Sequence, residues 1–296
     1  MTFSIVARSE DGESWGVAVA SKFLAVGSAV PAAVAGVGAI ATQADANVAW
    51  KGLALALLDE GATAGVALQH LLEEDEGRDD RQAGIVDAEG NAASHTGANC
   101  FDWAGGSTGP GYAAQGNILT GPEVVEAMER AWLEGVDLPF GRRLLGALAA
   151  GAQAGGDRRG RQSAALLVVR DGAGYGGRDD LAIDLRVDDH PEPLPELARL
   201  LDLHDLFLTA STEAERVPVT DELARELDER AQALGYEHFT AWVGSENYEM
   251  RVAPAPRPEW VDVQVLAILR ADSGDLSPGT ADAREQAETE SEEGRA

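Results

Sequence analysis

The chain has 296 residues, of which 45% are hydrophobic, so it can bury a core larger than that of one average domain. Its 51 acidic and 23 basic residues give a net charge of −28, which disfavours binding to nucleic acid or to an anionic membrane surface. Only Lys22 and Lys51 are lysines, and an acidic, lysine-poor surface is typical of a protein that works in concentrated salt. A biased base composition of the gene, together with an acidic tail, is the alternative explanation.

Cysteine content and hydropathy give an expected location. Cys100 is the single cysteine, so no intrachain disulfide can form, which suits a reducing compartment. No apolar run reaches the roughly 18 residues of a membrane span. The first residues lack the basic start and apolar core of a signal peptide. We therefore expect a cytoplasmic protein.

Hydrophobic spacing predicts the elements of the first two thirds of the chain. Two strands form an opening hairpin, and small and β-branched residues then favour tightly packed central strands. The expected strands are 3–7, 15–20, 23–30, 34–41, 81–86, 91–96, 112–118 and 163–170, the last turning into a partner strand at Asp171. The expected helices are 47–60, 62–74, 121–132 and 140–152. This order is not the strict alternation of a parallel α/β sheet. It predicts an α+β fold of two antiparallel sheets with helices on both outer faces.

The composition of the sequence changes after residue 184. A proline-rich link at 188–195 leads into a helix at 196–208, and 209–219 are expected to form a linker. Residues 220–270 have the helical spacing of a small accessory domain. Residues 271–296 are acidic and lack apolar spacing, which predicts disorder. The expected domains are therefore 1–208 and 220–270.

Thr2 is a candidate nucleophile. If Met1 is removed, the Thr2 hydroxyl lies on the same residue as a free α-amine, whose ordinary pKa of about 8 suits a general base at neutral pH. An N-terminal amine is a known activator of threonine. The alternative is that Thr2 is simply a small residue at the start of an edge strand.

Other polar residues stand where strands end. Lys22 follows the second strand, and a lysine beside a nucleophile can tune it by charge, although an ordinary exposed lysine is an equal alternative. The segment Gln115-Gly116-Asn117 offers an amide and N–H groups that suit an oxyanion site, or it is only a turn. The arginine-rich segment 157–163 could bind a substrate carboxylate.

Several other chemistries find little support. Cys100 has no histidine in a recognisable hydrolase arrangement, and a lone cysteine is more often core filling. The five histidines show no ligand spacing, so no metal site is expected. The glycines at 172–177 lack the order of a phosphate-binding loop, and we expect no cofactor.

Four segments together resemble the DUF1028 family of unknown function. They are 2–8, 16–27, 115–119 and 155–164, and the resemblance extends over about residues 1 to 208. That family is similar to N-terminal-nucleophile (Ntn) hydrolases, so the resemblance implies the four-layer αββα sandwich of proteasome subunits. Residues 220–270 resemble the peptidoglycan-binding-like domain often appended to it.

The resemblance also implies roles for individual residues. Thr2 takes the place of the proteasome-type nucleophile, Lys22 stands where those subunits have an aspartate, and Asp157 falls near their supporting aspartate. The stretch 41–45 lacks their lysine. We expect a catalytic set of Thr2, Lys22, Asn117 and Asp157. The expected substrate contacts are Ser21, Gln43, Gln115, Arg161, Gln162 and Ser163.

These observations predict a cytoplasmic Ntn-type amidohydrolase that cleaves a small amide without a metal or cofactor. We expect a homo-oligomer, with a dimer as the simplest form, and no nucleic acid or membrane partner. One alternative is a binding or scaffold protein that kept the fold and lost turnover, with a C-terminal domain that binds a polymer or partner. Another is chemistry through Cys100.

Overall fold

The computed structural model describes residues 2–254 and 256–274. The chain divides into two compact units, the first ending at Asp202 and the second beginning at Leu203. Both units combine helices with antiparallel strands, which confirms the predicted α+β class. Most of the predicted disordered tail, from residue 275 on, lies outside the described residues.

The first unit is built on a six-stranded antiparallel sheet with β1 near its middle. Strand β1 (Thr2–Arg8) pairs with β2 (Ser14–Ser21) on one side and with β8 (Tyr112–Asn117) on the other. The full order is β10 (Leu181–Val187), β9 (Ser163–Arg170), β2, β1, β8 and β7 (Gly105–Gly109). The central place of β1 means that Thr2 begins an interior strand and not an edge strand.

A second, four-stranded antiparallel sheet lies against the first. Its order is β3 (Pro31–Val34), β4 (Gly38–Ala44), β5 (Arg81–Asp87) and β6 (Ala92–Thr96). Val6 and Val19 of the large sheet pack with Ala39 and Val86 of the small one. The two sheets therefore share an apolar layer, and polar side chains occupy part of the same interface.

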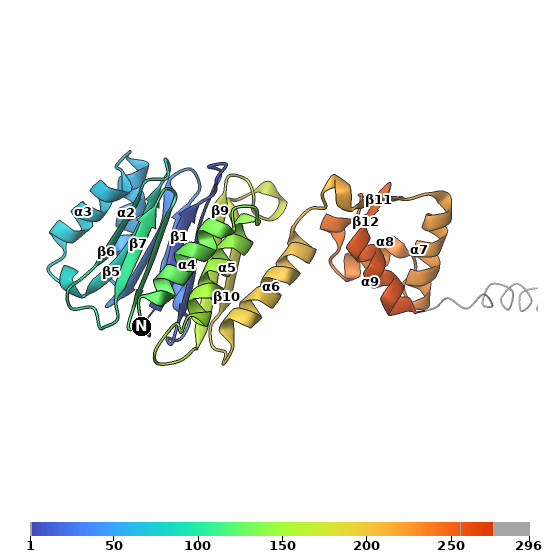
Figure 1. Cartoon of the computed structure of the whole chain (residues 1–296). Coiled ribbons are helices and arrows are strands. Elements are labelled where there is room, and N and C mark those ends of the chain that lie inside the picture. Colours follow the sequence, from blue (N-terminus) through green and yellow to red (C-terminus); the bar gives the residue numbers. More distant parts are fainter. Residues whose placement is uncertain (1, 255, 275–296) are drawn as a thin grey trace, which may run out of the picture. The chain divides into compact units, whose positions relative to one another are not determined.

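Helices cover the outer face of each sheet (Figure 1). Helices α2 (Trp50–Asp59) and α3 (Ala64–Glu74) pack on the small sheet through Trp50 and Leu71. Helices α4 (Glu123–Glu134) and α5 (Phe140–Gln153), with the first half of α6 (Pro193–Leu208), pack on the large sheet. Because successive strand residues point to opposite faces, Phe3 and Ile5 of β1 face these helices, and Thr2 and Ser4 face the small sheet.

Two expected strands are wrong. Residues 23–30 form a turn and the short helix α1 (Val26–Ala29), because Ser163 and Asp188 hold the backbone of this segment away from a strand partner. Residues 34–41 are not one strand, because the chain reverses at Gly36, whose φ of +73° suits a residue without a side chain, and continues as β4. Strand β7 was not predicted, since glycine is a weak strand former. Strand β10 was expected as the partner of the strand 163–170, but its bounds were not predicted.

The second unit combines helices with a two-stranded sheet. Its helices are α7 (Asp221–Ala233), α8 (Phe239–Ser245) and α9 (Val263–Ser273), and its strands are β11 (Arg216–Pro218) and β12 (Trp260–Asp262). Single 3₁₀ turns in the chain are Arg78–Asp80, Tyr175–Gly177, Glu213–Glu215 and Glu249–Arg251. The division of 1–208, linker and 220–270 stays a prediction, and the expected linker 209–219 contains β11.

A buried ion pair connects separate segments of the second unit. Arg251 Nη1 lies 2.9 Å from Asp262 Oδ2, and the two side chains are 6% and 1% exposed. Arg251 also donates to the backbone oxygens of Asp205 and Leu206 at the end of α6. Burial alone would raise the pKa of Asp262, but hydrogen bonds from Ser211, the Gln264 N–H and Arg251 lower it. The Asp262 carboxylate therefore remains charged beside Arg251.

Candidate active site

Thr2 is the first residue of β1 and lies between the two partner strands of β1. Its Cα partners are Ser21 of β2 and Asn117 of β8. The residue is 7% exposed, and its Oγ1 lies 3.1 Å from Ser21 Oγ. Three polar residues predicted from distant parts of the sequence thus meet at one end of the large sheet.

A network of buried amides lies behind Thr2, between the two sheets. Gln43 of β4 donates from Nε2 to the Thr2 carbonyl oxygen at 3.2 Å, and its Oε1 accepts from Ser4 Oγ at 2.6 Å. Gln115 of β8 donates to the same Ser4 oxygen at 2.7 Å. Gln43 belongs to the stretch 41–45, which contains no lysine. This stretch therefore contacts Thr2 through an amide side chain.

Gln82 is the centre of this network, and the sequence interpretation missed it. Its Oε1 accepts from Gln43 at 2.8 Å and from Asn117 Nδ2 at 2.9 Å, and its Nε2 donates to the Gly116 oxygen at 2.7 Å. The side chain is fully buried on β5. A glutamine directly before the small and apolar residues 83–86 was the signal that could have identified it, because buried polar groups need partners.

Asp157 and Lys22 meet through the backbone and not through an ion pair of their side chains. Asp157 Oδ2 accepts from the Lys22 N–H at 2.7 Å, and its Oδ1 accepts from the Arg159 N–H at 2.8 Å. The Asp157 side chain is 3% exposed, whereas Lys22 is exposed. Asp157 therefore fixes the end of β2, where Ser21 contacts Thr2.

The remaining predicted substrate contacts lie at the beginning of β9. Ser163 is buried, donates to the Phe23 oxygen at 2.5 Å and accepts from the Val26 N–H at 3.1 Å. Gln162 donates to Asp189 at 3.1 Å. A pocket of about 430 Å³ reaches from Ser21 and Asp157 to Arg161 and Ser163. Gln43, Gln115 and Asn117 are instead buried between the sheets.

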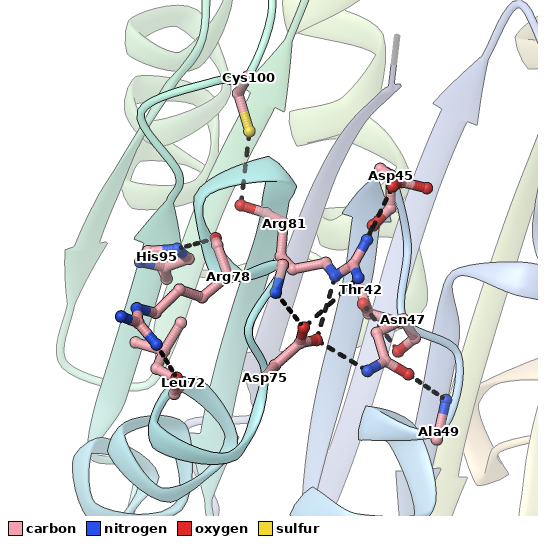
Figure 2. A network of polar contacts seen from close by, with 11 residues as sticks. Thr42, Asp45, Asn47, Ala49, Leu72, Asp75, Arg78, Arg81, His95 and Cys100 are labelled. Atoms are coloured by element: carbon pink, nitrogen blue, oxygen red, sulfur yellow. Dashed lines mark hydrogen bonds and ion pairs between the residues drawn. The ribbon is translucent and has the colours of Figure 1, made fainter.

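Cys100 belongs to a different polar network, at the beginning of β5 (Figure 2). Its Sγ lies 3.4 Å from the Arg81 oxygen, and the Arg81 side chain binds Asp75. Burial, and then the charge of Asp80, raise the pKa of the Cys100 thiol. A raised pKa disfavours the thiolate, which is the nucleophilic form, so this environment does not activate Cys100.

Among residues 2–254 and 256–274, no group of three or more His, Cys, Asp or Glu side chains is placed to hold a metal ion. No helix in this part of the chain is long and apolar enough to cross a membrane.

Comparison with known proteins identifies the family. The model of a family of unknown function, DUF1028, matches residues 2–197. The crystal structure of protein SPO2555 from Silicibacter pomeroyi, also assigned to DUF1028, is 34% identical, with a TM-score of 0.63 over 69% of this chain and 89% of that chain. The chain belongs to the DUF1028 family. This confirms the resemblance seen in the sequence for the first unit.

Two more distant structures resemble this DUF1028 chain. Anbu (ancestral beta-subunit) from Yersinia bercovieri is 12% identical with a TM-score of 0.30, over 68% of this chain and 93% of that one. The Anbu (Gly-1) mutant from Hyphomicrobium sp. strain MC1 is 11% identical with a TM-score of 0.31, over 72% and 99%. Similarity at this level carries no argument about fold or function. No functionally curated protein matches the chain.

Proposed function

We propose that this DUF1028 protein is an N-terminal-nucleophile amidohydrolase that cleaves a small amide with Thr2 after removal of Met1. The supporting observation is the position of Thr2, which begins a central strand and has its hydroxyl 3.1 Å from Ser21 Oγ. Gln43 donates a hydrogen bond to the Thr2 carbonyl oxygen, and Asp157 accepts one from the Lys22 N–H at the end of the neighbouring strand β2. Such fixed surroundings are what a nucleophile needs to keep one geometry.

In this proposal, the two facing sheets with helices on both outer sides are the αββα sandwich of the Ntn type. Placing the Thr2 side chain between the sheets agrees with that fold. The order of layers supports the assignment, because helices pack on the outer face of both sheets: Trp50 of α2 lies on the small sheet, and Leu144 of α5 lies on the large sheet.

The proposed reaction has two steps. The Thr2 hydroxyl oxygen attacks the amide carbon while the Thr2 α-amine accepts its proton. The carbon–nitrogen bond breaks, the amine passes the proton to the leaving nitrogen, and an ester remains on Thr2. Water then attacks the ester, which releases a carboxylic acid and restores the hydroxyl and the amine.

Asn117 is the proposed side-chain donor to the oxyanion. It pairs with Thr2 across β1 and β8, and Gln82 holds its amide at 2.9 Å. An amide nitrogen carries two hydrogens, so the bond to Gln82 leaves a second hydrogen for the negative oxygen. Asp157 is a positioning residue, and Lys22 would act on the amine through charge from its exposed position.

An amide-library hydrolysis screen in high salt tests the proposal. We expect wild-type protein to release amine from at least one small amide, and Thr2→Ala to release none. Thr2→Ser keeps the hydroxyl and should retain activity. If Thr2→Ala matched wild type on every amide cleaved, the proposal would be wrong.

The second candidate is a binding protein without turnover. It is favoured by a pocket of about 580 Å³ in the second unit, lined by residues including Arg225, His238 and Phe239. This candidate predicts no ester on Thr2, together with polymer affinity that disappears when residues 220–296 are deleted. The same deletion should leave amide hydrolysis by the first unit unchanged if the first candidate is correct.

A further inference from the structure

The 430 Å³ pocket of the first unit is lined mainly by apolar groups. Phe3 of β1, Leu145 of α5 and Leu194 of α6 line it, together with the polar residues Ser21 and Asp157. Its volume lies in the range of small-molecule sites, which is about 300–1,000 Å³. The pocket is therefore large enough for a ligand.

Small residues keep this space open. Ala149 and Ala152 of α5 line the pocket where longer side chains would fill it. Gly155 and Gly156 line it with φ values of +128° and +56°, a region that side-chain-bearing residues rarely adopt. The local backbone thus disfavours any side chain at these two positions.

A charged pair lies among the lining residues. Arg161, from the loop before β9, forms an ion pair with Glu192, which directly precedes α6. Their side chains are 54% and 53% exposed. Arg161 belongs to the densest basic segment of the sequence, Arg158-Arg159-Gly160-Arg161, in a chain of net charge −28.

We propose that this pocket binds the apolar body of a substrate that carries a carboxylate, and that Arg161 binds the carboxylate. The inference rests on the proposed function, because Ser21 lines the pocket and its hydroxyl oxygen lies 3.1 Å from Thr2 Oγ1. An exposed ion pair contributes little free energy, so a carboxylate held by the pocket can replace Glu192 on Arg161. The substrate class is then a small amide with an apolar body and an anionic end.

Binding to full-length Thr2→Ala protein tests this assignment without turnover. Octanoate and octanamide are matched probes that differ in the charge of one end. We expect isothermal titration calorimetry to show octanoate binding about tenfold more tightly than octanamide, because hydrogen bonds to charged groups are the stronger ones. Absence of binding by both probes at millimolar concentration would overturn the proposal.

Two charge variants identify the role of Arg161. Arg161→Gln should remove the preference for octanoate and leave octanamide affinity unchanged. Glu192→Gln should raise octanoate affinity several-fold, because it removes the competing carboxylate. Arg158→Gln is the matched control in the same loop, outside the pocket lining, and should keep the preference. An unchanged preference in Arg161→Gln would contradict the assignment.

Two volume variants test the pocket itself. Ala149→Leu should weaken both probes at least tenfold, because the longer side chain fills the space. Ala150→Leu makes the same change one residue further along α5, outside the lining, and should bind normally. Equal binding by the two variants would overturn the pocket assignment. If the probes bound as expected but wild-type protein showed no reaction at Thr2, the proposed function would be refuted and the pocket assignment would remain valid.

Discussion

Asp75 should stabilise the first unit through its charge. Its carboxylate lies 3.1 Å from Arg81 Nε and accepts from Asn47 Nδ2 at 2.8 Å (Figure 2). Asn47 leads into α2, Asp75 directly follows α3, and Arg81 begins β5, so the network ties two helices to the small sheet. We predict that Asp75→Asn lowers the free energy of unfolding at neutral pH.

The magnitude follows from the pKa of Asp75. Hydrogen bonds from Arg81 and then from Asn47 lower this pKa from 3.8 to about 2. A shift of this size corresponds to about 2 kcal/mol of stability. Because the folded-state pKa is the lower one, this contribution is fully present above pH 3.8 and is lost as the pH falls through about 2.

Urea denaturation of wild type and Asp75→Asn in the same salt, at steps from pH 7 to pH 2, measures the effect. The difference between the two proteins should be about 2 kcal/mol above pH 5 and should shrink toward pH 2. Asp79→Asn is the control, since Asp79 is exposed in the same loop, and it should change stability by less than about 0.5 kcal/mol. A difference that stayed constant down to pH 2 would refute the charge explanation.

Three further predictions concern other networks. Gln82→Ala should lower the free energy of unfolding by about 2–4 kcal/mol in urea denaturation, because Asn117 and Gln43 lose a buried partner, whereas exposed Gln69→Ala should have little effect. Arg251→Met should cost the second unit about 3–5 kcal/mol, because it leaves Asp262 buried without its cation, and a loss no larger than that of exposed Arg225→Met would contradict this. Cys100 should react with iodoacetamide at pH 8 more slowly than free cysteine, and an equal rate would show that burial does not raise its pKa.

Much of the fold could be predicted from local patterns. Strands β1, β2 and β9 have residues with β-branched and small apolar side chains, and these were placed within one or two residues of their bounds. The segment 23–30 has the same composition and is not a strand. Its backbone is held by Ser163 and Asp188, which lie far away in the sequence. A contact between residues so far apart in the sequence cannot be inferred from local composition.

The candidate site was predictable only in part, for the same reason. Thr2, Ser21 and Asn117 meet because they stand at the ends of adjacent strands, which a sequence can indicate. Gln82 reaches Asn117 across two facing sheets, and that contact depends on how the sheets pack. Asp157 bonds to the Lys22 backbone, so the side-chain chemistry of Lys22 gave no sign of their contact.

The most direct test of the account is covalent labelling of the intact protein with a β-lactone, followed by peptide mass mapping. The proposed mechanism predicts a mature chain that begins at Thr2, with one label on Thr2 that is absent from Thr2→Ala. A retained Met1 would block the amine and contradict the mechanism. A label on Cys100, or no label on Thr2, would equally contradict it.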